Sequence, residues 1–439
     1  MRTPIFDLVK RYADSGAARL HMPGHKGASL LGCEALDITE VDGADSLYEA
    51  SGIIKQSEHN ASNIFGCDTF YSTEGSSQCI RAMLYLAMLH AKASGKKPLI
   101  LAGRNAHKTY LSAAALLDFD IEWLHGGNSY LSCDIGAKDV EDAILKFSPA
   151  AVYLTSPDYL GNVLDIAAIA EVCKAHGVML LVDNAHGAYL KFLDKSRHPI
   201  DLGADICCDS AHKTLPALTG AAYLHISYDA PAFFAKNAKK ALSLFGSTSP
   251  SYLILQSLDL VNKYIADGYR EKLCEFTKKV QSLKNALSAS GFKLVGNEAL
   301  KITIATKPYG YIGTEFAAML KEMSLICEFA DPDFTVLMLT PENGSLKDIE
   351  KVLLDIPRRE PICAAPPVFH RCERIMSVRE AVFSECETVA IENSLGRVLA
   401  AATVGCPPAV PIVMCGERID VYAIECFKYY GIAECCVVK

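Results

Sequence analysis

The 439-residue sequence contains no apolar stretch that approaches the length of a membrane-spanning helix. Runs such as Val178 to Val182 are far shorter than the ~20 apolar residues needed to cross a bilayer. The first residues, MRTPIFDLVKRYADSG, carry charges throughout and contain no apolar core of a secretory signal. Internal repeats and low-complexity tracts are also lacking. We therefore expect a globular protein that stays in the cytoplasm and has no membrane partner.

An excess of positive charge is lacking as well. Lysine and arginine number 43 against 51 aspartate and glutamate residues, which gives a formal net charge of −8. Nucleic-acid binding needs a basic surface, so we predict no nucleic-acid partner. The negative balance is compatible with a cationic small-molecule substrate, although net charge says little about any single pocket.

The 17 cysteines are many, and their number is odd. Repeated C-x-x-C pairs are missing, so we predict free buried thiols in a reducing cytosol rather than a disulfide framework or a zinc site. His21 and His25 have the spacing of two metal ligands on one helix face. Pro23 and Gly24 lie between them and disfavour a helix, so we predict no metal site here.

Strand and helix patterns alternate from about residue 58, which predicts an α/β fold with a mostly parallel sheet flanked by helices. Helical spacing recurs at Val140–Lys146, Ile166–His176 and Thr314–Met323, and a long helical pattern runs from about Tyr252 to Ala289. The predicted strands are Leu99–Ala102, Ala151–Thr155, Val178–Val182, Ile206–Cys208, Ala221–Ile226, Lys301–Thr306 and Thr335–Thr340.

The same patterns suggest a division of the chain. Residues 1–57 mix short helical pieces with Gly- and Asp-rich loops and form an N-terminal arm. Residues 58–290 form a large domain, and residues 291–439 form a smaller C-terminal α/β domain that contains a Pro-rich connector at 357–367. Among the carboxylates of the arm, Asp42, Asp45 and Glu49 are either solvated or turned toward a cationic side chain.

The chemistry is expected around Lys213, in the segment SAHKTLPALTG from Ser210 to Gly220. An apolar run from Ala204 to Cys208 precedes this segment, and the run Val178 to Val182 ends in DNAH (residues 183–186). Because ligands of open α/β sheets bind beyond the carboxyl ends of strands, the two segments would face one pocket. The pocket would contain a lysine amine, a carboxylate and two imidazoles.

This set of groups is what a pyridoxal phosphate enzyme needs. Lys213 would bind the cofactor through a Schiff base, and Asp183 would pair with the protonated pyridinium nitrogen. The alternative for Lys213 is an exposed lysine on a loop, and the alternative for Asp183 is an N-cap of the next helix. An unpaired carboxylate after five apolar residues would be costly, which favours the cofactor role.

Two further segments suit the phosphate of such a cofactor. Gly75, Ser76 and Ser77 precede an apolar stretch with helical character, and a helix N-terminus with hydroxyls binds anions. Ser210 and His212 flank the lysine and would also reach a phosphate oxygen. The alternatives are an ordinary serine N-cap and a solvated histidine.

Several motifs resemble one family in the family's own order. They are similar to the ornithine/lysine/arginine decarboxylases, in the shorter bacterial branch that lacks a receiver-like N-terminal domain. The resemblance also extends through about Pro366 to Lys439. The motifs are HMPGHKG (21–27), DITEVDGADSL (37–47), RNAHK (104–108), LLVDNAHGA (180–188), SAHKTLPALTG (210–220) and STSPSY (247–252).

The resemblance implies fold type I of the pyridoxal phosphate enzymes, the aspartate aminotransferase-like fold, and further site residues. His107 would stack on one face of the cofactor ring and Ala185 would lie against the other. His186 would contact the ring hydroxyl or the substrate. Thr248, in the cluster 247–249, would reach the cofactor phosphate of a partner subunit, which implies a homodimer, or a higher oligomer, with shared active sites. The alternative for this cluster is a helix N-cap.

The resemblance also implies the reaction, which is decarboxylation of L-lysine, L-arginine or L-ornithine to the corresponding amine and carbon dioxide. Aminotransferases and aldolases use the same lysine, aspartate and phosphate site, so they remain alternatives. An inactive regulatory relative is a third alternative. The chain has an apparent deletion between Gly27 and Asp37, and TSPDYLG departs from the family's threonine–tyrosine pair at Asp158 and Tyr159.

Overall fold

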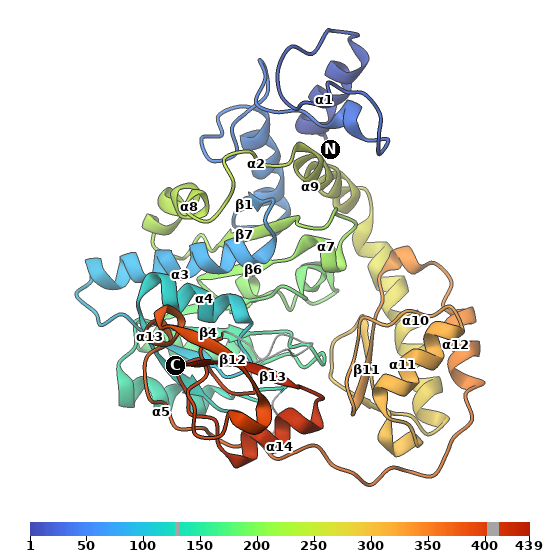
Figure 1. Ribbon diagram of the computed structural model, residues 1–439. Coiled ribbons are helices and arrows are strands. Elements are labelled where there is room, and N and C mark those ends of the chain that lie inside the picture. Colours follow the sequence, from blue (N-terminus) through green and yellow to red (C-terminus); the bar gives the residue numbers. More distant parts are fainter. Residues whose placement is uncertain (128–130, 402–411) are drawn as a thin grey trace. The chain divides into compact units, whose positions relative to one another are not determined.

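A seven-stranded sheet forms the centre of the predicted α/β architecture (Figure 1). The computed structural model describes residues 1–127, 131–401 and 412–439. The strand order is β1-β7-β6-β5-β4-β2-β3. The strands are β1 Asp68–Ser72, β2 Leu99–Gly103, β3 Asp120–Leu124, β4 Ala151–Thr155, β5 Met179–Asp183, β6 Ile206–Asp209 and β7 Ala222–Ile226.

The pairing of these strands is mostly parallel, as predicted. Strand β2 pairs in parallel with β3 and β4, and β5 pairs in parallel with β6. The exception is β7, which is antiparallel to both β6 and β1. Strands β1 and β3 were not predicted from the sequence, whereas the other five were, with bounds that differ by at most one residue.

The chain divides into two compact units, each described here by itself. Residues 1–96 and 166–274 form the first unit, which contributes β1, β7, β6 and β5. Residues 97–165 and 275–439 form the second. The helices of the first unit are α1 Pro4–Asp14, α2 Ile53–Phe65, α3 Gly75–Ala93, α6 Ile166–Ala175, α7 Ala211–Thr214, α8 Phe233–Ser243 and α9 Tyr252–Ala266. The domain boundaries expected from the sequence remain a prediction.

The core of the first unit lies along β5, β6 and β7, whose residues are all buried. Near-continuous apolar runs such as MLLV and ICC are what strands covered on both faces require. Helix α3 packs on β6 and β7. The polar residues Asp183 and Asp209 are the last residues of β5 and β6, so each sits at a carboxyl strand end.

The helical pattern predicted over Tyr252–Ala289 is interrupted in the structure. It forms α9 and a second helix, α10 Tyr269–Ala289. Between them lies Gly268 with φ +102°, a backbone conformation that residues with a side chain rarely adopt. The glycine therefore separates two helices that the apolar periodicity alone had joined.

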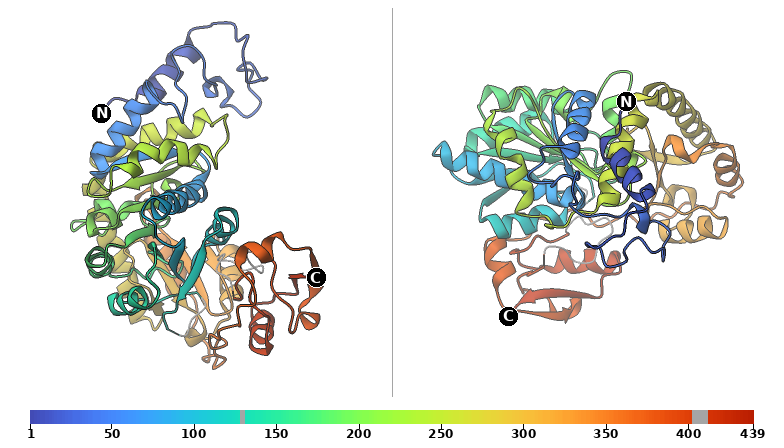
Figure 2. Two further views of the ribbon diagram at one scale, coloured as in Figure 1. Left: turned by 90° about the vertical axis from the view of Figure 1, so that its left-hand side faces the viewer. Right: turned by 90° about the horizontal axis from the view of Figure 1, so that it is seen from above.

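The N-terminal arm is tied to α9 by a buried carboxylate. Asp259 Oδ2 accepts hydrogen bonds from the backbone N–H groups of Ile5 at 2.9 Å and Phe6 at 3.1 Å. Asp45 is buried as well and accepts from the N–H groups of Gly52 and Ile54 at the start of α2. It is therefore a helix cap, not part of a solvated acidic loop. The loop after α1 extends away from the strands of this unit (Figure 2).

The second unit contains helices α4, α5 and most of α10, and two further sheets. One sheet is antiparallel in the order β10-β11-β9-β8, and the other pairs β12 with β13. The elements are α4 Lys108–Leu117, α5 Ala137–Phe147, β8 Lys293–Val295, β9 Lys301–Ala305, α11 Gly313–Glu322, β10 Phe329–Ala330, β11 Phe334–Met338, α12 Lys347–Leu354, α13 Val378–Phe383, β12 Cys386–Ala390, α14 Val421–Tyr429 and β13 Glu434–Val438.

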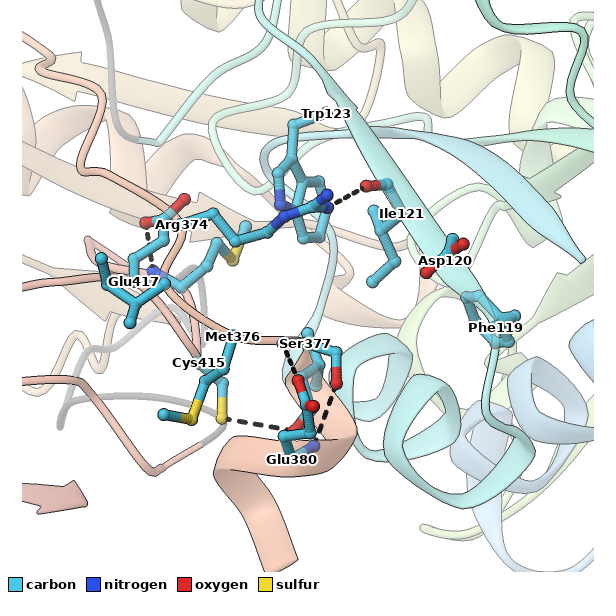
Figure 3. A pocket seen from close by; sticks show the side chains of 13 residues that line it. Phe119, Asp120, Ile121, Trp123, Arg374, Met376, Ser377, Glu380, Cys415 and Glu417 are labelled. Atoms are coloured by element: carbon cyan, nitrogen blue, oxygen red, sulfur yellow. Dashed lines mark hydrogen bonds between the residues drawn. The ribbon is translucent and has the colours of Figure 1, made fainter. Parts of the chain in front are cut away.

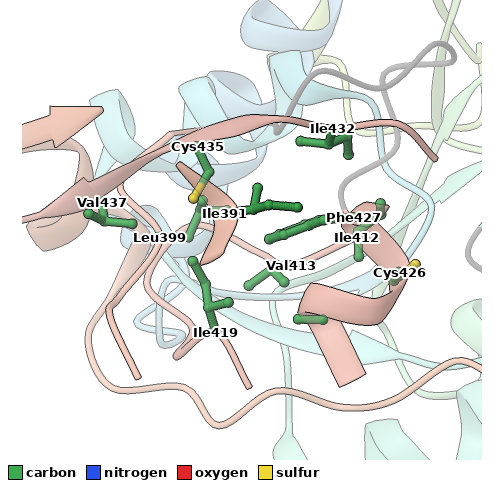
Figure 4. Packing of buried hydrophobic residues seen from close by; sticks show 11 residues of the cluster. Ile391, Leu399, Ile412, Val413, Ile419, Cys426, Phe427, Ile432, Cys435 and Val437 are labelled. Atoms are coloured by element: carbon green, nitrogen blue, oxygen red, sulfur yellow. The ribbon is translucent and has the colours of Figure 1, made fainter. Parts of the chain in front are cut away.

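The C-terminal segment of this unit, residues 371–439, has a hydrophobic core of its own. Leu399, Phe427 and Val437 are fully buried in it (Figure 4). Burial of each such side chain stabilises a fold by about 1.5–3 kcal/mol. Residues 357–370 precede this segment and contain no helix or strand.

Within the described residues, no helix combines the length and the apolar character needed to cross a bilayer. The cysteines of the described ranges are free thiols, most of them buried or partly buried. Burial raises the pKa of the Cys207 and Cys208 thiols, so both stay protonated near neutral pH.

Candidate active site

Lys213 lies one turn beyond the carboxyl end of β6, in the short helix α7. Its backbone N–H donates to the Ser210 carbonyl at 3.0 Å, and its side chain is half-buried. The amine Nζ lies 3.0 Å from Nε2 of His186, a buried residue that follows β5. The structure thus brings together two of the predicted catalytic residues, a nucleophilic amine and an imidazole that can exchange protons with it.

Asp183 ends β5 and is only 3% exposed. Its Oδ1 accepts from the Ala185 N–H at 3.2 Å and from the Cys208 thiol at 3.7 Å. Cys208 is its register partner on β6. Asp183 thus lies at the carboxyl end of the strand next to β6, the strand that leads to Lys213. The location therefore suits an acid that pairs with a cationic ring nitrogen.

A tight turn holds His186 in place. The Gly187 N–H donates to the Asn184 carbonyl at 2.7 Å. A Cβ atom at Gly187 would lie 2.0 Å from Asn184 Oδ1, so only glycine fits without displacing the asparagine. Asn184 in turn donates from Nδ2 to Asp209 Oδ1 at 2.6 Å. The turn that carries His186 is therefore fixed to the end of the neighbouring strand.

Sequence reasoning missed Asp209 and its two histidine partners. His198 Nε2 and His225 Nε2 donate to Asp209 Oδ2 at 3.1 and 3.2 Å, and all three side chains are fully buried. Burial alone would raise the pKa of Asp209, but the two imidazoles outweigh it and hold that pKa below its ordinary value. This ionised cluster lies next to Ser210 in the chain. A carboxylate closing the apolar run Ile206–Cys208 was the signal that could have revealed it.

The predicted phosphate residues meet at the start of α3. Ser210 donates from Oγ to Ser76 Oγ at 2.8 Å, and Ser76 and Ser77 lie in the first turn of this helix. The Gly75 N–H donates to the Gly220 carbonyl at 2.7 Å, which joins this turn to the segment after Lys213. Two hydroxyls and a helix N-terminus at one place suit an anion.

His212 and Thr248 have different surroundings. His212 Nδ1 donates to the Ala221 carbonyl at 2.9 Å, and burial lowers the pKa of this imidazole. Thr248 is exposed in the connection between α8 and α9. The phosphate role predicted for His212 from its position, and that of Thr248 implied by the resemblance, remain predictions.

His107 belongs to the second unit, whereas Lys213 belongs to the first. His107 is the N-cap of α4, and its Nδ1 accepts from the Thr109 N–H at 3.2 Å. Its predicted stacking on the cofactor ring therefore remains a prediction. The His21–His25 loop contains a contact of His25 Nε2 with Asp37 Oδ2 at 3.2 Å, which joins the first two motifs.

Comparison with known proteins identifies the family. The sequence matches the Orn/Lys/Arg decarboxylase major domain over residues 3–344 and the Orn/Lys/Arg decarboxylase C-terminal domain over residues 371–436. The chain belongs to the Orn/Lys/Arg decarboxylase family.

Relatives match this family member along nearly its whole length. An arginine decarboxylase of Halalkalibacterium halodurans is 29% identical, with 95% of this chain and 91% of the relative covered. YaaO of Bacillus subtilis, an uncharacterized protein, is 27% identical, with coverage of 97% and 93%. The lysine decarboxylase LdcF of Francisella novicida has a similar fold, with a TM-score of 0.78 at 16% identity over 100% of this chain and 81% of that one. The predicted fold class is thereby confirmed.

The two residues at the position of the threonine–tyrosine pair, Asp158 and Tyr159, have structural partners in this family member. Asp158 follows β4, and its carboxylate accepts from the Asn162 N–H and from Asn162 Nδ2, both at 2.8 Å. Burial raises the pKa of Asp158. Tyr159 donates from its hydroxyl to Glu328 Oε1 at 2.9 Å. Asp158 thus closes the loop after β4 on itself, and Tyr159 fastens this loop to Glu328, elsewhere in the second unit.

A cavity of about 270 Å³ lies elsewhere in the second unit of this decarboxylase family member (Figure 3). Ile121 and Trp123 of β3 line it together with Arg374, Met414 and Glu417 of the C-terminal segment. Arg374 Nη1 donates to the Ile121 carbonyl at 2.8 Å. The C-terminal segment therefore covers the edge strand β3, and the predicted catalytic residues are not among the residues that line this cavity.

Proposed function

We propose that this Orn/Lys/Arg decarboxylase family member is a pyridoxal 5'-phosphate-dependent enzyme that decarboxylates a basic L-amino acid. The substrate would be lysine, arginine or ornithine, and the products the corresponding amine and carbon dioxide. One observation carries the proposal. The Lys213 amine lies 3.0 Å from the His186 imidazole, beyond two neighbouring parallel strands that end in the buried carboxylates Asp183 and Asp209.

The residues at these strand ends fit the cofactor. Lys213 would hold its aldehyde and Asp183 its ring nitrogen, while Ala185 and His186 would lie beside the ring. The hydroxyls of Ser76 and Ser210 meet at 2.8 Å at the start of α3, where an anion is favoured. The remaining residues of the proposed site are Gly75, Ser77, His107, His212 and Thr248.

Bound pyridoxal phosphate supplies an electron sink for the pair left behind when a carboxylate leaves as carbon dioxide. Asp183, buried at the end of β5, would hold a positive charge on the ring nitrogen and so keep that sink effective. His186 exchanges a proton with Lys213 Nζ over their 3.0 Å contact. Lys213 or His186 then returns a proton to the substrate Cα.

The proposal includes a homodimer with shared active sites. Leu20, Leu30 and Leu31, in the loop after α1, are 93%, 87% and 89% exposed. Several large apolar side chains this exposed in one loop are typical of a surface that a second chain covers. Thr248 is exposed too, as a residue must be to reach a neighbouring copy. Free thiols throughout the described residues support a cytoplasmic location.

The proposed reaction is tested by incubating the cofactor-supplied protein with L-lysine, L-arginine and L-ornithine in turn. We expect carbon dioxide and one diamine or agmatine in equal amounts, and no keto acid. Lys213→Ala should lower the rate at least about a thousandfold because it removes the activated amine. Lys195→Ala, at an exposed lysine of the same unit, should leave the rate unchanged.

Other products would contradict the proposal. A keto acid would show transamination, and cleavage of a hydroxy amino acid would show an aldolase. Release of no carbon dioxide from any of the three amino acids, with cofactor bound, would show an inactive relative.

A further inference from the structure

Arg104, the first residue of the RNAHK motif, is a buried arginine at the carboxyl end of β2. It is 7% exposed, although arginine is rarely buried unless its charge is paired. Its backbone N–H donates to the Leu124 carbonyl at 3.0 Å, which fixes the residue to the end of β3. The proposed function gives no role to this side chain.

The guanidinium of Arg104 is bound by the C-terminal segment. Its Nη2 donates to the Ile412 carbonyl at 3.1 Å and lies 3.5 Å from Glu417 Oε2. The guanidinium carbon is 5.9 Å from the centre of the Trp123 ring and 5.8 Å from that of Phe369. Such a planar cation between two rings and a carboxylate is held in one orientation.

Glu417, the carboxylate partner of Arg104, is also held by contacts with its own segment. Its Oε2 accepts from the Met414 N–H at 2.8 Å (Figure 3). Its backbone carbonyl accepts from the Leu399 N–H at 2.9 Å, next to the core of the C-terminal segment. Arg104 therefore binds a rigid part of that segment.

The connection continues from Arg104 to His107 through Asn105 and Ala106. The Ala106 N–H donates to the Gly103 carbonyl at 3.0 Å and closes a turn. His107 follows as the N-cap of α4. The far end of α4 is held by the same segment, because Arg379 Nη1 donates to the Ala115 carbonyl at 2.7 Å.

We propose that Arg104 is a positioning residue through which the C-terminal segment holds His107, a residue of the proposed site. This inference rests on the proposed function. Arg104 does not touch the reacting atoms. It acts by fixing the turn from which the imidazole projects, and Glu417 acts through Arg104.

The test measures cofactor affinity by titrating the apo-protein with pyridoxal phosphate and following the absorbance of the bound form. Arg104→Gln should weaken binding by at least about tenfold, and Arg104→Lys should weaken it less. In a His107→Ala background, Arg104→Gln should have almost no further effect, because the group that it positions is gone. The double variant Arg104→Gln/Glu417→Gln removes both charges of the buried pair, so neither charge is left buried without its partner. It takes the place of Arg104→Gln if that single variant fails to fold.

Arg418→Gln is the matched control. It breaks an exposed arginine–glutamate pair of the same segment, with Glu373 at 2.8 Å, and should leave cofactor affinity unchanged. Equal losses with and without His107, or no loss from Arg104→Gln and the double variant, would overturn the positioning role. Failure of the unaltered protein to bind pyridoxal phosphate would instead contradict the proposed function.

Discussion

Lys213 and His186 come from loops that follow different strands, and their contact depends on the turn and carboxylate cluster that support them. Asn184 links the turn to Asp209, and Asp209 is held by His198 and His225. Lys213 is half-buried, whereas His186 and the groups that support it are buried. At the scale of single residues, the half-buried amine therefore contacts an imidazole that a buried polar network orients.

Replacement of the buried carboxylate of Asp209 should destabilise the folded protein. Asp209→Asn removes the charge that two buried imidazoles surround, and we expect it to lower the free energy of unfolding by about 3–5 kcal/mol. The pKa of Asp209 lies below its ordinary value, so its stabilisation is complete above about pH 4 and is lost as the pH falls further. Urea unfolding at pH 7 and in acid measures both effects.

Asp229→Asn is the control, at an exposed aspartate of the same unit, and should change stability by less than about 0.5 kcal/mol. If Asp209→Asn lowers the free energy of unfolding by no more than this control does, the cluster contributes nothing to stability.

At the scale of elements, α9 positions the N-terminal helix through one acid. Asp259 accepts from the first backbone N–H groups of α1, and its Oδ1 accepts from Ser57 Oγ of α2 at 2.5 Å. Three helices thus share a single buried carboxylate. Burial raises the pKa of Asp259 from 3.8 to about 6.

This shift predicts a pH dependence of stability. A folded-state pKa above the unfolded value means that the folded protein binds more protons between pH 4 and 6, so stability falls as the pH rises through this window. A rise from 3.8 to about 6 corresponds to about 3 kcal/mol. Urea unfolding of the unaltered protein should show this loss, and Asp259→Asn should not. Asp267→Asn, at an exposed aspartate, is the reference variant. The same dependence of stability on pH in the unaltered protein and in Asp259→Asn would contradict the prediction.

Local patterns in the sequence predicted the elements that carry Lys213 and Asp183, because buried parallel strands are continuous apolar runs closed by polar residues. They did not predict β1 and β3, which are as long as the predicted strands but contain polar residues that interrupt the apolar run. The Asp209 cluster was missed because its histidines are 11 and 16 residues away on other elements. The interruption at Gly268 was missed because helical periodicity continues through it.

At the scale of the whole molecule, the exposed apolar loop after α1 bears on assembly. We expect the unaltered protein to sediment as a dimer. The double variant Leu30→Lys/Leu31→Lys should shift it to monomer and lower carbon dioxide release, because charge in a buried interface is costly. Leu145→Lys, on α5 and 65% exposed, is the control and should leave both unchanged. An unaltered protein that is active as a monomer would refute the shared site.

The pairing of β1 with β7 has a consequence during synthesis. Asp68 is opposite Ile226, so the first strand to leave the ribosome has no neighbour until more than a third of the chain has followed. Helix α3, already complete, must wait as well for β6 and β7, on which it packs. Long-range pairing of this kind is slow and exposes apolar surface in the meantime. The nascent amino-terminal segment is thus where a chaperone would be needed first.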